Sequence, residues 1–243
     1  MSGASQVPAL DGRVVIVTGA SSGIGAAFAR LAAGEGARLV LAARRTERLE
    51  ALAAELPDAL AVTADLRLPE QARAVVGAAT QRYGGVDVLV NNAGQGLHVP
   101  VEEVRLDDFE AVVRLNLYAP LLLMQEVVPL MRARGGGSIV NVGSNTTRMV
   151  IPGIGPYSAT KSALDQLSAT ARAEWAAEGI AVSLVIPSIT ATEFHSALRA
   201  GTMRAGGHIV PHPPEVVAEA ILRAVETGEA EVFPEPPPDR GED

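Results

Sequence analysis

The sequence of 243 residues contains no cysteine and only one lysine among its 20 basic residues. It also lacks any run of the roughly 20 apolar residues that a membrane span needs. Without cysteine there is no disulfide bond, thiolate metal ligand or cysteine nucleophile, which is compatible with a reducing compartment. The first ten residues, MSGASQVPAL, lack the charged and apolar regions of a secretory signal. These absences predict a cytoplasmic protein.

An excess of positive charge is missing too. The formal net charge is -8 and the arginines are dispersed along the chain. Proteins that bind nucleic acid or anionic membranes usually cluster their basic residues. We therefore expect neither as a partner, and expect a small molecule instead. The chain is 48% hydrophobic, enough to bury a large core, so residues 1–243 are predicted to form a single domain.

The apolar segments alternate between two kinds of pattern. RVVIVTGA, RLVLAA and LAVTAD are typical of strands, and each is followed by a stretch with helical spacing. The alternation continues to a last helix over 216–227 and a short edge strand at 231–233. Apolar strands separated by helices predict a parallel sheet covered on both faces. The predicted fold is therefore a doubly wound, Rossmann-type sheet of about seven strands in three α/β/α layers.

Residues 188–214 interrupt this alternation with several glycines and prolines. A long insertion after the C-terminal end of a strand is either a substrate lid or a solvated loop. Because ligands of open α/β sheets bind at those strand ends, we favour the lid. Residues 234–243 are rich in proline and charge, which predicts a flexible tail.

The motif TGASSGIG, residues 18–25, follows the first strand and opens the first helix. Its glycines permit a tight turn, a close backbone approach to a pyrophosphate, and close packing of helix on sheet. The helix N-terminus adds free N–H groups and positive potential. A plain strand-to-helix turn would also contain glycine and serine, but the position after the first strand favours dinucleotide binding. The predicted contacts are Gly19, Ser21, Ser22, Gly23, Ile24 and Gly25.

Arg44 and Arg45 stand at the end of the second strand, where an acidic residue would bind the ribose 2′-hydroxyl of NAD. Guanidinium groups match the geometry of a phosphate, so this pair predicts NADP(H) as the cofactor. The alternative is that both are ordinary surface charges at a helix start, where the helix dipole disfavours them. Asp65, at the end of the third strand, either accepts a hydrogen bond from adenine or caps the following helix.

The single lysine, Lys161, lies four residues after Tyr157, one of only three tyrosines. On a helix the two side chains share a face. A cation roughly 5 Å from a phenol, at an effective dielectric of about 20, lowers the pKa of the phenol by on the order of two units. Tyr157 then approaches the range of a general acid or base, and a compact ammonium suits this place better than a guanidinium. The alternative is an exposed helix charge.

Together these motifs resemble the short-chain dehydrogenase/reductase family. TGASSGIG, NNAG at 91–94, Asn116, Ser144 and YSATK at 157–161 stand in the order and spacing of that family. The resemblance implies that Tyr157 exchanges a proton with the substrate oxygen and that Ser144 hydrogen-bonds this oxygen. It further implies that Lys161 lowers the pKa of Tyr157 and holds the nicotinamide ribose, and that Asn116 anchors a water molecule that relays protons.

The resemblance also implies the rest of the cofactor site. Arg44 matches the basic position of NADP-preferring members, and Asp65 matches the adenine-binding aspartate. The other implied cofactor contacts are Leu66, Asn92, Ala93, Gly94, Pro187, Ile189 and Thr192. The sequence departs from the family at Ser188, where glycine is common after proline. Serine adopts a positive φ less readily than glycine, so the path of this loop stays open.

Pro120 lies four residues after Asn116 within a helical pattern. It has no N–H to donate to the carbonyl oxygen of Asn116. We predict that this carbonyl is left free to bind the relay water. A simple proline kink is the alternative.

Three segments should line the substrate pocket: residues 95–99, residues 145–156 and the predicted lid. The predicted substrate contacts are Leu97, His98, Ser144, Met149, Ile154 and Phe194, with Val150, Ile151, Leu198 and Met203 adding to an apolar wall. The histidines at 98, 195, 208 and 212 are otherwise expected to be ordinary loop residues. Their spacing does not force a metal site, and hydride chemistry on a nicotinamide needs no metal.

The prediction is thus an NADPH-dependent enzyme that reduces a ketone or aldehyde, or oxidises the secondary alcohol. A protein that senses or displays NADP without turnover is the alternative, although it would not need Asn116, Ser144, Tyr157 and Lys161 together. The family resemblance implies a homodimer or homotetramer formed through helices over 107–134 and 157–178.

Overall fold

The computed structural model describes residues 10–202 and 211–235, apart from the side chains of residues 195 and 196. The strands of its sheet are β1 Val14–Thr18, β2 Arg38–Ala43, β3 Ala59–Thr63, β4 Val88–Asn91, β5 Gly137–Val142, β6 Ile180–Val185 and β7 Glu231–Val232. The α-helices are α1 Gly23–Gly34, α2 Thr46–Glu55, α3 Pro69–Tyr83, α4 Leu106–Val113, α5 Ala119–Ala133, α6 Gly155–Trp175 and α7 Pro214–Thr227. Residues 203–210 of the predicted lid and 236–243 of the predicted tail lie outside the described residues.

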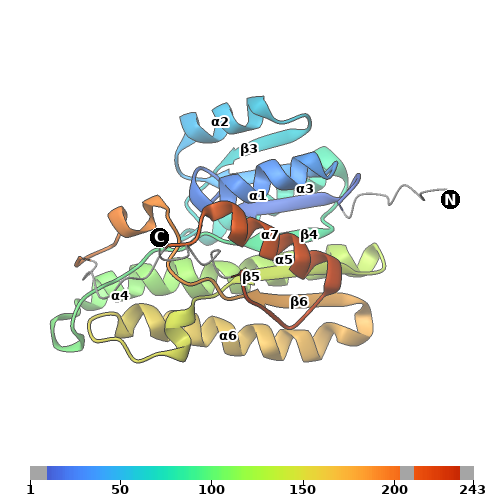
Figure 1. Cartoon of the computed structure of the whole chain (residues 1–243). Helices are drawn as coiled ribbons and strands as arrows, with labels where there is room; N and C mark the ends of the chain where they lie inside the picture. Colours follow the sequence, from blue (N-terminus) through green and yellow to red (C-terminus); the bar gives the residue numbers. More distant parts are fainter. Residues whose placement is uncertain (1–9, 203–210, 236–243) are drawn as a thin grey trace, which may run out of the picture.

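All neighbouring strands are parallel, in the order β3-β2-β1-β4-β5-β6-β7 (Figure 1). The chain first builds outward from β1 through β2 to β3, and then returns to place β4 on the other side of β1. Ligands of such sheets bind beyond the C-terminal ends of the strands where the order reverses, here β1 and β4. The predicted doubly wound fold with seven strands is confirmed.

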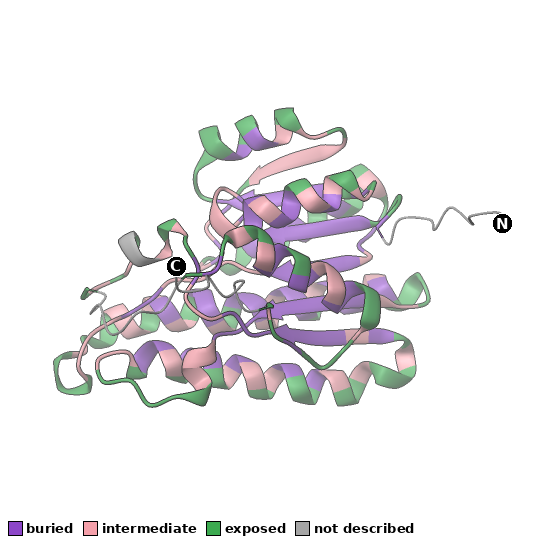
Figure 2. Ribbon diagram, viewed as in Figure 1, coloured by how far each residue is buried: buried purple, intermediate pink, exposed green. Residues whose placement is uncertain are grey.

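Helices cover both faces of the sheet, as the strand sequences require. All five residues of β1, VVIVT, are buried, which is expected for a parallel strand between two helical layers. Phe28 of α1 and Ile221 of α7 belong to the core on one face, and Val75 of α3 and Leu123 of α5 to the core on the other. Figure 2 shows the central strands buried and the outer sides of the helices exposed.

The helix predicted over 107–134 runs continuously from Leu106 to Ala133. Between α4 and α5, residues Arg114–Tyr118 form a π-helical turn, in which the N–H of Ala119 bonds the carbonyl oxygen of Arg114. The missing N–H of Pro120 explains why the regular ladder shifts here.

By length and composition this 28-residue helix is also long and apolar enough to cross a membrane, contrary to the sequence prediction. However, 44% of its apolar window is buried, and α5 packs on α3 and the sheet as a core helix does.

Candidate active site

A cleft of about 1050 Å³ opens at the C-terminal ends of β1, β4, β5 and β6. Its wall includes the loop after β1, the ends of β2 and β3, residues 92–94, residues 142–146, part of α6 and part of the segment 187–202. Of the residues predicted to bind cofactor or to act in catalysis, all but Gly25 and Asn116 lie on this wall. The fold therefore brings segments from the whole length of the sequence to one place.

The loop after β1 has the backbone geometry that its glycines permit. Gly19 has a φ of 66° and Gly23 a φ of 54°, both in the left-handed region that favours glycine. A Cβ atom on Gly25 would lie 2.4 Å from the carbonyl oxygen of Gly19, so a side chain does not fit there. Gly25 thus packs α1 against the loop instead of facing the cleft, while α1 begins at Gly23 and points its N-terminus toward the cleft.

Thr18, the first residue of TGASSGIG but not among the predicted contacts, ties this loop to the end of β4. Its hydroxyl oxygen accepts hydrogen bonds from the N–H groups of Asn92 and Ala93, at 2.9 and 3.0 Å. The Asn92 amide donates to the carbonyl oxygen of Thr18 at 2.9 Å. These bonds fix the two loops that flank the reversal of strand order.

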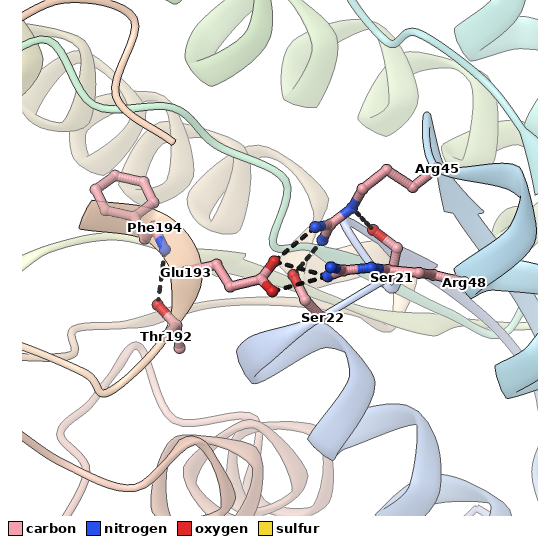
Figure 3. Close-up of polar contacts among 7 residues, drawn as sticks. All are labelled: Ser21, Ser22, Arg45, Arg48, Thr192, Glu193 and Phe194. Carbon is pink, nitrogen blue, oxygen red and sulfur yellow. Dashed lines mark hydrogen bonds and ion pairs between the residues drawn. The ribbon is translucent and has the colours of Figure 1, made fainter. Parts of the chain in front are cut away.

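The two arginines after β2 lie at the edge of the cleft but have different surroundings. Arg45 reaches back over the loop after β1, where Nε donates to Ser21 Oγ at 3.1 Å and Nη2 donates to Ser22 Oγ at 2.5 Å. Its Nη1 also binds the carboxylate of Glu193 at 2.5 Å (Figure 3). Arg44 lies on the wall without a hydrogen bond or ion pair to any other described residue. The sequence analysis missed Glu193, since it stands in an irregular segment 148 positions from Arg45.

Asp65 lies on the cleft wall with its carboxylate already bound. Arg67 Nε donates to its two oxygens at 2.9 and 3.1 Å, and this hydrogen-bonded guanidinium lowers the pKa of Asp65. Asp65 does not cap α3, because the N-cap residue of that helix is Leu68. The capping alternative is therefore wrong.

Tyr157 and Lys161 lie one turn apart on α6, and both face the cleft. Their exposed fractions are 7% and 4%, so neither points into bulk solvent. Lys161 Nζ donates to the carbonyl oxygen of Val142, at the end of β5, at 2.8 Å. It also lies 3.6 Å from the position that a Cβ atom on Gly94 would take. The reading of Lys161 as an exposed helix charge is wrong.

The ionisation of this pair is dominated by burial. Burial raises the pKa of Tyr157 to about 12, while a hydrogen bond with Ser144 acts to lower it. Burial also lowers the pKa of Lys161 to about 8. The expected lowering of the Tyr157 pKa is therefore wrong for the arrangement in this structure, because the loss of water outweighs the effects that favour the phenolate. Asp165, one turn beyond Lys161, adds to the rise in the pKa of Tyr157 and opposes the lowering of the pKa of Lys161.

Ser144 follows β5 and lies on the wall beside Tyr157. Its Oγ accepts a hydrogen bond from the backbone N–H of Thr146 at 3.3 Å, which caps a short 3-10 turn over Asn145–Arg148. This turn holds the hydroxyl group on the wall of the cleft.

Asn116 does not line the cleft but lies buried beneath its wall. Its side chain is completely buried; Oδ1 accepts from the backbone N–H of Gln95 at 2.9 Å, and Nδ2 donates to the carbonyl oxygen of Gln95 at 3.0 Å. Nδ2 also donates to Thr160 Oγ1 at 3.1 Å. The side chain thus clamps the loop after β4 onto α6. Its backbone carbonyl lies in the π-helical turn, where Pro120 has no N–H to donate.

The predicted substrate contacts mostly meet around Tyr157. The rings of Phe194 and His98 lie 5.6 and 6.2 Å from the ring of Tyr157, measured between centroids. The predicted contacts on the cleft wall are His98, Ser144, Met149, Ile151, Ile154 and Phe194. Leu97 is fully buried in the core and does not line the cleft, so that prediction is wrong.

Three other expectations for the apolar wall had different outcomes. Val150 and Leu198 are not on the wall, since Val150 is 99% exposed and Leu198 packs near Gly96. Met203 and His208 lie outside the described residues, as does the side chain of His195.

The loop after β6 brings Pro187, Ile189 and Thr192 to the cleft wall. No described residue other than glycine has a positive φ, so Ser188 keeps an ordinary backbone conformation in place of the family's glycine. Thr192 packs closely against the loop after β1, since a Cβ atom on Gly23 would lie 2.8 Å from its methyl group.

Comparison with known proteins agrees with this site. Residues 13–202 match the short chain dehydrogenase family. The D-threitol dehydrogenase of Mycolicibacterium smegmatis is 33% identical over 225 residues, which cover 88% of this chain and 86% of that protein. A segment of glycine betaine reductase from Emericella nidulans is 36% identical over 226 residues, but the chain spans only 18% of that protein's length.

Solved structures with this fold carry different cofactors. A metagenomic short-chain oxidoreductase in complex with NADP is 32% identical, with a TM-score of 0.80 over 94% of this chain and 99% of that chain. A short-chain dehydrogenase/reductase from Burkholderia phymatum in complex with NAD is 25% identical, with a TM-score of 0.84 over 93% and 90%. From the family match, the relatives and the arrangement of the cleft, it follows that the chain belongs to the short-chain dehydrogenase family of oxidoreductases.

Proposed function

We propose that the protein is an NADPH-dependent carbonyl reductase that acts on a ketone or aldehyde of moderate size. One observation carries the proposal: a buried tyrosine and the only lysine of the chain face the same cleft as a glycine-rich loop and two arginines. The loop after β1 would hold the pyrophosphate, and Lys161 and residues 92–94 would hold the nicotinamide ribose. The bound cofactor supplies a hydride to the carbonyl carbon, or accepts one in the reverse direction.

Residues of the chain donate the proton that the substrate oxygen takes up and later replace it. Tyr157 donates its phenolic proton to the substrate oxygen, and the Ser144 hydroxyl hydrogen-bonds the same oxygen. The ammonium of Lys161 favours the phenolate that remains, against the burial that raises the pKa of Tyr157 to about 12. The backbone carbonyl of Asn116 holds the water that returns the proton, because the polar atoms of the Asn116 side chain are engaged by Gln95 and Thr160.

The preference for the phosphorylated cofactor is supported by charge at the end of β2. Arg44 and Arg45 line the cleft there, and they stand at the end of β2 where NAD-binding members of such folds carry an acidic residue for the ribose 2′-hydroxyl. Arg44 contributes a guanidinium that no other described side chain pairs with, so it is available to a 2′-phosphate. The reading of both arginines as ordinary surface charges does not account for their place on the cleft wall.

The activity is tested by following NADPH consumption with a panel of ketones and aldehydes. Tyr157→Phe should abolish turnover while leaving NADPH binding intact, because only the phenolic hydroxyl is removed. Tyr83→Phe is the matched control, since Tyr83 lies in α3, outside the cleft wall, and its hydroxyl donates to Asp58. Tight NADPH binding with no turnover on any carbonyl would favour the alternative of a cofactor sensor.

The cofactor preference is tested separately. Arg44→Ala should weaken NADPH binding by at least tenfold and change NADH binding little, since a charge-assisted contact to phosphate is worth roughly 1.5–3 kcal/mol. Arg30→Ala, which removes an exposed arginine paired with Glu55, is the control. Equal losses for the two cofactors in Arg44→Ala would remove the case for a phosphate contact.

We also propose a cytoplasmic homodimer or homotetramer assembled through α4, α5 and α6. Leu106 at the start of α4 and Tyr118 at the end of the π-helical turn are 80% and 56% exposed, and a second copy would cover them. Light scattering gives the mass in solution, and a monomer at micromolar concentration would contradict the assembly.

A further inference from the structure

An ion-pair cluster spans the edge of the cleft between α2 and the segment after β6. The carboxylate of Glu193 binds Arg45 Nη1 at 2.5 Å and Arg48 Nη1 at 2.8 Å (Figure 3). Arg45 is bound at the same time to Ser21 and Ser22 of the loop after β1. A single side chain therefore links the predicted lid to the residues that would hold the phosphates of the cofactor.

Three consecutive residues anchor this part of the chain to three parts of the site. Thr192 lies against Gly23 of the loop after β1, and Phe194 stacks at a tilt beside the ring of Tyr157. Between them, Glu193 starts the 3-10 turn Glu193–Ser196 and lies on the cleft wall. Its position on the wall means that its carboxylate shares the edge of the cleft with the arginines it binds.

We propose that Glu193 is a residue that determines cofactor selectivity: its carboxylate occupies guanidinium donors of Arg45 that a 2′-phosphate would use, and the phosphate must displace it. The inference rests on the proposed NADPH preference and adds a competitor built into the chain. Selectivity then depends on an exchange of anions at Arg45, and not only on the presence of Arg44 and Arg45.

The chemistry of the two anions supports such an exchange. Arginine binds carboxylates and phosphates through the same planar donors, so both fit the place. A 2′-phosphate carries more negative charge and more acceptor oxygens than a carboxylate, which allows it to displace Glu193. The 2′-hydroxyl of NAD(H) is neutral and does not compete for a guanidinium. Glu193 therefore stays on Arg45 and Arg48 when the cofactor lacks the phosphate.

The competitor is present over a wide range of pH. Hydrogen bonds from Arg45 and then Arg48 lower the pKa of Glu193 to about 2, so its carboxylate is ionised near neutrality. Both ion pairs are about half exposed, and solvent and salt screen them. This screening keeps the contact weak enough to be exchanged.

The test uses two adenosine probes that differ only in the phosphate at issue: adenosine 2′,5′-bisphosphate and adenosine 5′-monophosphate. Calorimetry gives their dissociation constants for the wild type and for Glu193→Gln. The variant should bind the bisphosphate roughly fivefold more tightly, the size expected when exposed ion pairs stop competing, and the monophosphate unchanged. Glu55→Gln, which breaks the exposed pair with Arg30 away from the cleft, should change neither constant.

The possible results distinguish the role of Glu193 from the NADPH preference on which it rests. A wild type and a Glu193→Gln variant that each bind both probes equally would overturn the NADPH preference and the role of Glu193 with it. A wild type that prefers the bisphosphate, with Glu193→Gln unchanged, would overturn only the role of Glu193. Equal tightening of both probes in the variant would also overturn it, since Glu193 would then obstruct the cleft without competing for the phosphate position.

Discussion

Replacing Lys161 by methionine should raise the pKa of Tyr157, because it removes a positive charge from the same face of α6. Residues four apart on a helix have side chains roughly 5 Å apart. At an effective dielectric of about 20, a unit charge at that distance contributes about 3 kcal/mol. Since one pKa unit corresponds to about 1.4 kcal/mol, the expected rise is about two units. In the structure without cofactor, burial raises the pKa of Tyr157 to about 12, so the effect of Lys161 is sought in the complex with NADP⁺.

This pKa is measured by ultraviolet titration of the complexes with NADP⁺, since tyrosinate and tyrosine absorb differently. Subtracting the titration of the matching Tyr157→Phe protein isolates the signal, which is needed because burial, with a hydrogen bond to Asp58, also raises the pKa of Tyr83 to about 12. Lys161→Arg serves as the control. It keeps the charge and should keep most of the lowering, although its wide fork fits the site less well.

An identical Tyr157 titration in the wild-type and Lys161→Met complexes would refute the electrostatic reasoning. Lys161 would then serve only to hold the cofactor, and Lys161→Met would weaken NADP⁺ binding without moving the pKa. A lysine that both lowers the pKa of Tyr157 and holds the cofactor should show both changes, so the two measurements together distinguish it from a lysine that only binds the ribose.

Two further predictions concern stability. Gly25→Ala should lower the melting temperature by several degrees, because the added methyl group would lie 2.4 Å from the Gly19 carbonyl oxygen. Such overpacking costs about 1–3 kcal/mol. Gly34→Ala is the control on the same helix and should cause no loss, since the space around Gly34 is open. The free energy of unfolding without cofactor should rise from about pH 8 toward pH 10. The pKa of Lys161 is about 8 in the folded protein and 10.5 in the unfolded chain, so the unfolded chain binds more protons in this range. Above pH 10 the trend should reverse, since Tyr157 keeps its proton up to a pKa of about 12 and the unfolded chain does not. Urea unfolding at several pH values checks both trends, and a rise that persists in Lys161→Met would contradict the assignment to Lys161.

The parts of the site that the sequence predicts well are those governed by local spacing. Tyr157 and Lys161 share a face because the helix repeat places residues four apart together, whatever packs around them. The glycines at 19 and 25 are likewise explained by contacts within one loop and the helix that follows it. The parallel sheet covered by helices on both faces follows from the alternation of apolar strands and helices.

The errors arise where the outcome depends on residues far apart in sequence. Burial of Tyr157 involves Phe194 and His98, which come from other loops, so the helix spacing alone does not give the net pKa. Leu97 is apolar and adjacent to His98, and spacing alone does not tell which of the two faces the cleft. Asp65 is an exception, because the residue that binds its carboxylate, Arg67, lies only two positions away in the sequence.

The contacts of the cleft have a consequence for the salt dependence of cofactor binding. Arg45 is already bound to Glu193, so a 2′-phosphate replaces one screened ion pair by another. Salt weakens both the pair that is lost and the pair that is formed, and the two effects partly cancel in the wild type. In Glu193→Gln only the phosphate contact remains, so its affinity for NADPH should fall more steeply with rising salt. Measuring dissociation constants between low and physiological ionic strength checks this, and parallel salt dependences would mean that no anion is exchanged at Arg45.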